Sequence, residues 1–404
     1  MKFNSHSMDP ENLKNRSRLY YISPRDVRRN RADPVHIMKT CLEFSKYFRE
    51  VILVTPGYVR KGDPDTIQDI MKLYGMSPSF AIDELPSRLK DDSPAFTERF
   101  RKFVYPIIYF LQKKFSGKLS PSDRIYSKCY IGSLPVLLLK KTGLIKAPLT
   151  FELASIRPER WYPKFFLRHC DSVVVINRYL QDLLVNDFRI PEEKIKILRF
   201  PSQFEEYEKA LKRSAVEVRK ELSIPPDRPL VVYAGKIKPQ MKEITWMLET
   251  AAGLERYHFL FVGVQEEYRD YFNKYTASNP LQNVTFEGFQ PLGTIYEYLS
   301  AADLLLSYHD PDLILSRHQM LPAKSGIYLC TGKPCIFADL PSLREYLNDD
   351  LVWFVEPGNP NALSAKIKEV FREKEEAVRK AQNAKAFAKE NTYARSYKEI
   401  VGFL

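Results

Sequence analysis

Short apolar runs alternate with amphipathic stretches along most of the chain. In the first half, strands are predicted at 18–23, 51–56, 124–128, 148–153, 172–176 and 194–198, with helices near 34–48, 97–115, 130–141, 163–169 and 178–187. Residues 57–95 are mainly polar and predict loops around short elements. In the second half, strands are predicted at 230–235, 258–263, 283–288, 303–308, 334–339 and 353–357, with helices near 241–253, 266–276, 293–301, 322–331, 341–347 and 360–372. Apolar strands separated by helices are typical of a parallel sheet that is covered on both faces.

Because this alternation runs through the chain twice, the predicted fold class is α/β, with two Rossmann-like domains facing a cleft. We assign the first domain to residues 1–200 and a linker region to 201–229, which ends in the Pro-rich stretch IPPDRP. The second domain is assigned to 230–385. The last helix, at 386–404, is charged and could cross back to the first domain.

Composition narrows the class of protein. Of the 404 residues, 44% are hydrophobic and 28% charged, which is typical of a globular protein and excludes collagen-like and largely disordered chains. The five cysteines are scattered, so packed thiols in a reducing compartment are expected rather than a disulfide framework. The N-terminus has no apolar core typical of a signal peptide, and no run of about 18 apolar residues predicts a membrane span. We therefore expect a cytoplasmic protein, either free or peripheral on the cytoplasmic face of a membrane.

The net charge of +12 is unevenly distributed. Residues 1–200 carry +14 and residues 201–404 carry −2. This asymmetry predicts an anionic partner for the first half, such as an acceptor, a membrane surface or nucleic acid. Segments 98–115 and 157–169 mix aromatic residues with Lys and Arg, which suits either a membrane interface or an ordinary amphipathic helix on the core. No nucleic-acid-binding module is recognisable, so no specific nucleic acid is expected.

Two segments of the second half carry candidate phosphate-binding residues. The stretch YAGKIKPQMKE ends a strand in Gly235 and places Lys236 and Lys242 six residues apart, where they could neutralise a diphosphate. Further on, Lys324, Ser325 and Gly326 stand at a predicted helix start, where backbone N–H groups favour an anion.

Together with several other segments, these motifs resemble the nucleotide-sugar-dependent glycosyltransferases of the GT-B fold, in the family-4 (group 1) branch. The segments that carry the resemblance are FVG at 261–263, VTFEGF at 284–289, the P-x-K and G-K-P block at 322–334, DLPSLRE at 339–345, PGNPNAL at 357–363 and, in the first half, FELAS at 151–155. The resemblance implies that the second domain binds a nucleoside diphosphate sugar, which is a substrate, and that no cofactor is needed.

The resemblance also implies site residues. Lys236 and Lys242 would contact the donor phosphates and stabilise the departing diphosphate, aided by the amides of Ser325 and Gly326. Lys324 would either pair with a phosphate or only cap the start of the helix. Gly235, Gly263 and Glu345 complete the implied donor site. No metal is expected, although Asp-Pro-Asp occurs at 63–65 and at 310–312.

The chain departs from the family at positions that usually carry chemistry. The family's E-x-H signature falls on Glu152 and Ala154, so its histidine is missing, and the two acids of its E-x7-E motif fall on Gln319 and Ile327. His309 and His318 are candidate substitutes or structural hydrogen-bonding groups. Glu152 ends a strand at the carboxyl edge of the sheet, where it could bind the acceptor, act as a general base or be a structural acid.

The function predicted from these observations is a glycosyltransferase, hexosyltransferase in type and retaining. It would move a sugar from a nucleoside diphosphate sugar to a glycan, lipid-linked or otherwise anionic acceptor in polysaccharide or glycoconjugate biosynthesis. The alternative is a non-catalytic GT-B scaffold or regulatory subunit, which the missing histidine and acids would explain.

Overall fold

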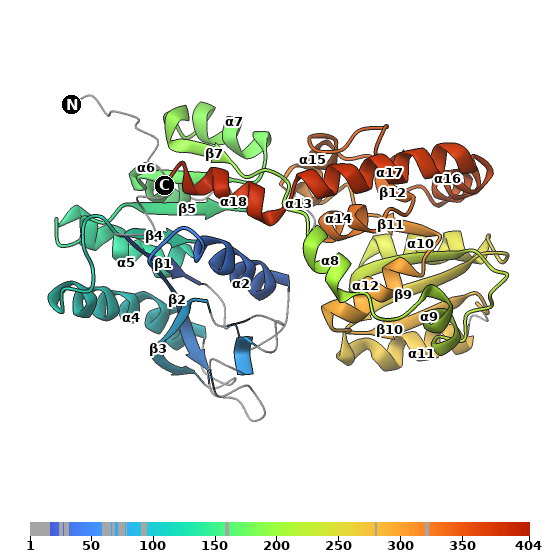
Figure 1. The fold of residues 1–404 in the computed structure, drawn as a ribbon, viewed down its shortest axis with the longest axis horizontal. Helices are drawn as coiled ribbons and strands as arrows, with labels where there is room; N and C mark the ends of the chain where they lie inside the picture. Colours follow the sequence, from blue (N-terminus) through green and yellow to red (C-terminus); the bar gives the residue numbers. More distant parts are fainter. Residues whose placement is uncertain are drawn as a thin grey trace. The chain divides into compact units, whose positions relative to one another are not determined.

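The computed structural model divides into two compact units. The N-terminal unit comprises Met1–Arg199 and Tyr393–Leu404, and the C-terminal unit comprises Phe200–Thr392 (Figure 1). The structure describes residues 17–23, 27, 32–58, 66, 69–71, 77, 79–89, 95–157, 161–278, 281–319 and 323–404.

The N-terminal unit is built on a parallel sheet. Within its described residues the strand order is β3-β2-β1-β4-β5-β6-β7. The strands are β1 (Arg18–Ile22), β2 (Glu50–Tyr58), β3 (Ala81–Leu89), β4 (Arg124–Ser127), β5 (Leu149–Leu153), β6 (Ser172–Val175) and β7 (Ile195–Ile197). The order reverses beside β1, so β1 and β4 are neighbours although two strands separate them in the sequence. Such a reversal opens the sheet at its carboxyl edge, where ligands of this fold class bind.

Helices cover both faces of this sheet. They are α2 (Ala32–Phe44), α4 (Ala95–Phe115), α5 (Tyr130–Lys141), α6 (Trp161–His169), α7 (Arg178–Asn186) and α18 (Tyr393–Val401), with a 3₁₀ turn at Glu192–Lys194. α2 and α18 pack on one face, where Phe44, Tyr397 and Ile400 share a core with Tyr21. The right-handed crossovers place α4, α5 and α6 on the other face, where Tyr20 contacts Phe110 of α4.

The C-terminal unit has a second parallel sheet, with the described order β10-β9-β8-β11-β12-β13. Its strands are β8 (Leu230–Ile237), β9 (His258–Val264), β10 (Val284–Gly288), β11 (Leu304–Ser307), β12 (Cys335–Ala338) and β13 (Trp353–Val355). This order reverses beside β8, which pairs with β9 on one side and with β11 on the other. The carboxyl ends of β8, β9 and β11 are therefore the expected binding edge of this unit.

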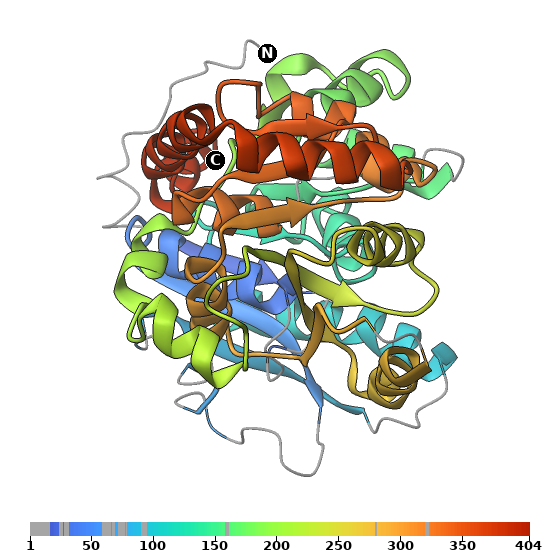
Figure 2. The same cartoon turned by 90° about the vertical axis from the view of Figure 1, so that its right-hand side faces the viewer.

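The helices of this unit also form two layers. They are α8 (Phe204–Ala210), α9 (Ala215–Glu221), α10 (Lys242–Ala252), α11 (Arg269–Ser278), α12 (Leu292–Ser300), α13 (Ile314–His318), α14 (Ala323–Tyr328), α15 (Pro341–Arg344), α16 (Pro360–Arg372) and α17 (Lys374–Glu390), with 3₁₀ turns at Glu266–Tyr268 and Leu329–Thr331. Figure 2 shows α10, α11 and α16 on one side of the sheet and α8, α9 and α12 on the other. One continuous apolar core lies between the layers. Its buried residues are spread along the sequence from Phe200 to Ala388.

All twelve strands predicted from apolar runs are present, but three features differ from the sequence prediction. Residues 81–89 form β3 rather than a loop; Pro86 lies in it, which an edge strand tolerates because one of its sides needs no backbone donor. The region 201–229 is no free linker, because α8 and α9 pack on α12 within the C-terminal unit. The chain leaves that unit after Thr392, so α17 belongs to it and only α18 joins the N-terminal unit.

Candidate functional site

Two glycines bring the carboxyl ends of β8 and β9 close together. Gly263 has a φ of +111°, and a Cβ at this position would lie 2.1 Å from the carbonyl oxygen of Gly235. The pairing of the two strands shifts register between Ala234 and Ile237, so Gly235 and Lys236 lie in an irregular step of β8. Only glycine fits at residue 263. The backbone of β8 and β9 is therefore irregular at the expected binding edge.

The side chain of Lys324, from α14, reaches this step. Its ammonium nitrogen lies 4.1 Å from the centroid of the Tyr233 ring, and a Cβ on Gly235 would come within 3.2 Å of it. Gly235 thus leaves room for the cation, and Tyr233 offers it the face of an aromatic ring. No residue that the structure describes forms a hydrogen bond or an ion pair with this ammonium.

Burial controls the charge of Lys324. It lowers the pKa of the ammonium to about 7, although the carboxylate of Glu243 acts in the opposite direction. Glu243 lies on the first turn of α10 and is itself buried; burial raises its pKa, while Lys324 favours its charged form. A bound anion would stabilise the charged form of Lys324, so this position suits a phosphate oxygen.

Lys242 and Lys236 supply exposed positive charge near the same edge. Lys242 is the first residue of α10, and its ammonium lies 2.8 Å from Asp312 and 3.7 Å from Asp310. The hydrogen bond to Asp312 raises the pKa of Lys242. Lys236 follows Gly235 on β8 and is exposed. Lys236 thus lies on β8 beside Gly235, and Lys242 begins α10. That the two lysines converge on a diphosphate stays a prediction.

The residues that follow β11 are mostly engaged in the fold. The Tyr308 hydroxyl donates to the carbonyl of Glu356 and accepts from the N–H of Asn359, so it fixes a loop. His309 is buried beside Ser307, and burial, with the nearby charge of Lys324, holds its pKa well below the usual range. A neutral imidazole at this position can accept or donate one hydrogen bond, but it adds no positive charge.

α14 uses its small residues for packing. A Cβ on Gly326 would lie 2.9 Å from the carbonyl oxygen of Pro201, so glycine lets the helix approach the backbone of the C-terminal unit. Ser325 is fully buried, and its hydroxyl has no hydrogen-bond partner within the described residues. Ile327 and Gln319, which replace the family acids, are also buried. That the amides of Ser325 and Gly326 bind phosphate stays a prediction.

A comparison with known protein families finds a similarity that lies within this unit. Residues 215–387 match the model of the family described as Glycosyl transferases group 1. The C-terminal unit is therefore similar to group 1 glycosyltransferases over most of its length. The matched range contains Gly235, Lys236, Lys242, Gly263 and Lys324, which form the edge described above. No curated protein sequence matches the chain.

Solved structures extend the likeness to both units. A glycosyltransferase from Rickettsia africae has a TM-score of 0.72 at 14% identity, over 96% of this chain and 98% of that one. Sucrose-phosphate synthase from Thermosynechococcus elongatus has a TM-score of 0.72 at 16% identity, over 95% and 97%. HepE from Anabaena, solved in complex with UDP, has a TM-score of 0.68 at 14% identity, over 95% and 98%. Together with the two parallel sheets, these likenesses confirm the predicted fold of two Rossmann-like domains.

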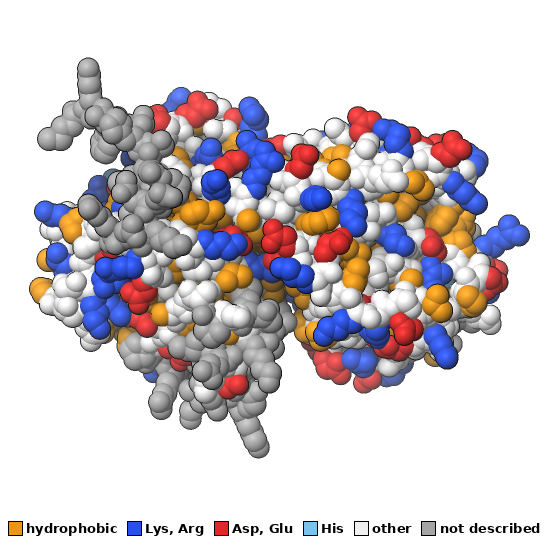
Figure 3. Space-filling view, in the orientation of Figure 1, with side chains coloured by type: hydrophobic (Ala, Val, Ile, Leu, Met, Phe, Trp, Pro, Cys, Tyr) orange, Lys and Arg blue, Asp and Glu red, His pale blue; other side chains and the backbone are white. Residues whose placement is uncertain are grey.

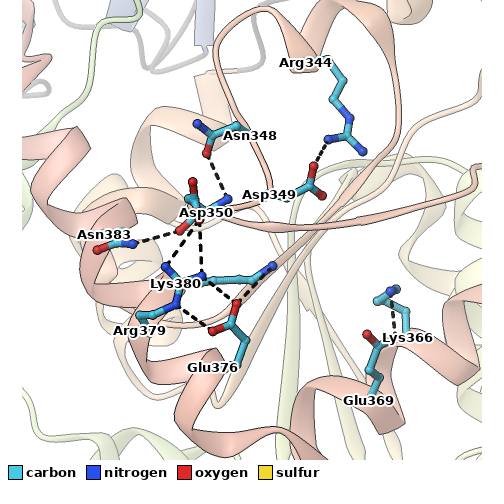
Figure 4. Close-up of polar contacts among 10 residues, drawn as sticks. All are labelled: Arg344, Asn348, Asp349, Asp350, Lys366, Glu369, Glu376, Arg379, Lys380 and Asn383. Carbon is cyan, nitrogen blue, oxygen red and sulfur yellow. Dashed lines mark hydrogen bonds and ion pairs between the residues drawn. The ribbon is translucent and has the colours of Figure 1, made fainter.

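Glu345 lies at the end of α15 in the C-terminal unit. This side chain is exposed, and adjacent residues of a helix do not face each other, which disfavours an ion pair with Arg344. Arg344 instead forms a bidentate pair with Asp339 at 2.7 and 2.9 Å and covers the ring of Phe354. Figure 4 shows its contact with Asp349. A donor-binding role for Glu345 therefore stays a prediction that its exposure permits.

Glu152, the candidate from the N-terminal unit, is completely buried at the carboxyl end of β5. One carboxylate oxygen lies 2.8 Å from the ammonium of Lys128 and 3.0 Å from the imidazole of His36, and the other accepts a hydrogen bond from Tyr126 at 2.7 Å. Burial acts to raise the pKa of Glu152, but Lys128 and His36 outweigh it and hold the pKa well below its usual range. Such a carboxylate is a weak base, so the geometry favours a structural or positioning role over proton transfer.

Sequence reasoning did not find the partners of Glu152. His36 lies on α2, where its two ring nitrogens contact Glu152 and the hydroxyl of Tyr393, and Tyr397 of α18 lies 3.5 Å from Glu152. These residues come from segments more than 100 positions apart, and only the fold joins them. The one available signal was Lys128, which is the last residue of the strand predicted at 124–128.

Neither a metal centre nor a membrane span is seen in the part of the chain that the structure describes. No three His, Cys, Asp or Glu side chains there form a ligand group, and Asp310 and Asp312 are paired with Lys242. The second Asp-Pro-Asp, at 63–65, lies outside the described residues. None of the described helices is long and apolar enough to cross a bilayer.

Proposed function

We propose that the chain is a glycosyltransferase that takes a sugar from a uridine diphosphate sugar and transfers it to an acceptor hydroxyl. The similarity to group 1 glycosyltransferases supports the class of reaction. The choice of uridine rests on HepE, a structural neighbour that has been solved with UDP and with UDP-glucose. The acceptor is a glycan or a lipid-linked molecule, and the transfer retains the anomeric configuration, as the group 1 resemblance implies.

The single observation that carries this proposal is the half-buried Lys324, whose ammonium lies over the Tyr233 ring at the step of β8. A partly desolvated cation from which no described residue accepts a hydrogen bond is stabilised when an anion completes its environment. The donor's diphosphate supplies that anion, and Lys236 and Lys242 flank it with exposed charge. The position at the carboxyl edge is the one at which nucleotide phosphates bind in this fold class.

The reaction that follows from this arrangement is a substitution at the anomeric carbon. The bond between this carbon and the diphosphate oxygen breaks, and its electron pair leaves with the UDP. The acceptor oxygen forms the new bond, and its proton passes to the departing phosphate. Lys324, Lys236 and Lys242 stabilise the negative charge that develops on the leaving group. Glu152 stays ionised and takes no proton; it holds Lys128 and His36 in place at the sheet edge of its own unit.

Calorimetric titration with UDP tests the donor site. The wild-type chain is expected to bind UDP, and Lys324→Met to weaken binding about 10- to 100-fold, the effect of losing one charge-assisted hydrogen bond. Lys380→Met is the matched control. It removes a buried lysine, which lies 4.2 Å from the ring centroid of Trp353 on the far helix α17, and should leave UDP affinity unchanged.

Two results would contradict the proposal. If the wild-type chain binds neither UDP nor any other nucleoside diphosphate, it is a non-catalytic scaffold of the GT-B fold. If UDP binds but Lys324→Met has no effect, the phosphates lie elsewhere. Release of UDP from a set of common UDP-sugars, measured with and without glycan acceptors, then identifies the sugar.

A further inference from the structure

The outer face of the N-terminal unit carries apolar side chains that its core does not use. On α4, the inner side holds Tyr109 and Phe110, which are buried against Tyr20. The opposite side exposes Phe100 (57%) and Phe115 (79%). A helix that faces only solvent on one side normally has polar residues there.

These outward residues form a regular stripe along α4. Phe100, Val104, Ile108, Leu111 and Phe115 follow one another at intervals of three and four residues, which places them on one side of the helix. Phe100, Ile108 and Phe115 are exposed, and the other two are half-buried. α4 is thus apolar on two sides, and only one of them is explained by the fold.

The neighbouring helices repeat this pattern. α4 packs beside α5, and α5 beside α6. α5 exposes Ile131 and Leu138, seven residues apart, and α6 exposes Tyr162 and Phe165, three apart, while Tyr130 and Phe166 face the core ring of Phe151. The three helices therefore share one outward apolar surface, which we call the α4–α6 face.

Basic residues predominate on these helices, although Lys113 and Lys140 pair with Asp83 and Asp171 of neighbouring segments. The sequences of the three helices contain nine Lys and Arg residues and a single acid, Glu98. Lys114 and Lys141 are exposed near the ends of α4 and α5, and Lys118 follows α4. Figure 3 shows blue Lys and Arg side chains and orange hydrophobic ones together over α4 and α5.

We propose that the α4–α6 face docks the protein on an anionic lipid bilayer. Separate large apolar side chains can enter the boundary between headgroups and acyl chains, and the surrounding lysines meet the lipid phosphates. A protein partner fits less well, because the cores of protein interfaces are depleted in lysine. The inference is independent of the proposed donor site, which lies on the other unit.

Co-sedimentation of the full chain with vesicles tests this inference. Binding is expected to vesicles with about 30% phosphatidylglycerol, and to be much weaker with phosphatidylcholine alone or in about 0.5 M NaCl. The combined variant Phe100→Ser, Ile108→Ser and Phe115→Ser should bind at least about tenfold more weakly, since each buried apolar group adds to membrane affinity. Lys114→Glu with Lys141→Glu should weaken binding to anionic vesicles only.

The matched control removes equally exposed apolar side chains from the other unit. Val216→Ser with Val378→Ser should bind vesicles like the wild type. Circular dichroism and UDP titration confirm that each variant is folded. The proposal is overturned if the wild type does not bind anionic vesicles, or if the triple serine variant binds them as tightly as the wild type. It is also overturned if light scattering shows a dimer that this variant dissociates, because the face would then join two copies of the chain.

Discussion

Two ionisable residues that are shielded from solvent, Glu152 fully and Lys324 in part, show how neighbouring groups determine the charge of a side chain. Glu152 is surrounded by Lys128, His36 and Tyr126, which satisfy its charge and keep it ionised. Lys324 is half-buried against an aromatic ring, with no hydrogen-bond acceptor among the described residues. Glu152 therefore belongs to a hydrogen-bonded network whose charges are already balanced, and this network stabilises the fold. Lys324 can instead accept an anionic ligand as its partner.

The state of Lys324 predicts how UDP affinity depends on pH. In the free protein the pKa of this ammonium is about 7, and a bound diphosphate raises it because the anion favours the charged form. Above pH 7, binding must therefore take up a proton, and affinity falls as the pH rises, by at most about tenfold per pH unit. Titrations from pH 7 to 8.5 should show this slope in the wild type.

Lys324→Met removes the titrating group, so its weaker UDP binding should vary much less over the same range. Lys380→Met should keep the wild-type slope. Equal slopes in the wild type and Lys324→Met would show that another group takes up the proton.

At the scale of elements, the irregular step between β8 and β9 joins fold and function. It depends on Gly263, whose backbone conformation and contact with Gly235 both exclude a side chain. The step opens the space into which Lys324 projects from α14. Elsewhere in the same unit, α17 is held to the loop after α15 by Arg379 and Asn383, which contact Asp350 (Figure 4). Such exposed contacts add little stability.

Gly263→Ala is expected to destabilise the protein by about 3 kcal/mol or more, because the strained backbone alone costs about 1–3 kcal/mol and the clash with Gly235 adds to it. Urea unfolding measures this change. Gly293→Ala is the control. Gly293 lies in α12 with open space around it, so alanine should be neutral or stabilise the helix by up to about 1 kcal/mol. A neutral Gly263→Ala would mean that the two strands separate here at little cost.

At the scale of the whole molecule, each unit has its own core, but the chain returns to the first unit at its end. α18 fills the core over α2 with Tyr393, Tyr397, Ile400 and Val401, all buried. Each such side chain contributes about 1.5–3 kcal/mol. Their sum is comparable with the whole stability of a typical domain.

Deleting residues 393–404 should therefore unfold the N-terminal unit and leave the C-terminal unit folded. Limited proteolysis followed by mass spectrometry is expected to return a resistant fragment close to residues 200–392. Tyr397→Phe keeps the buried ring and removes only the hydroxyl near Glu152, so both units should resist digestion in this control. A truncated chain whose N-terminal unit stays resistant would show that α18 is dispensable for that core.

The sequence alone determined the class of fold and the position of most elements. Continuous apolar strands and amphipathic helices follow from local periodicity, which is why the twelve strands and the two α/β halves were predicted from it. Gly235, Lys236 and Lys242 could be singled out for the same reason, because they lie within one strand–loop–helix segment. β3 was missed since its pattern includes Pro86 and several polar residues.

Tertiary structure decided everything that joins distant segments. Pairing of β8 with β9 brings Gly263 against Gly235, and α14 then adds Lys324 with a lowered pKa. Folding likewise surrounds Glu152 with residues from α2, β4 and α18, which changed a candidate base into a satisfied carboxylate. Charge state depends on burial and on neighbours in space, and neither can be read from spacing along the chain.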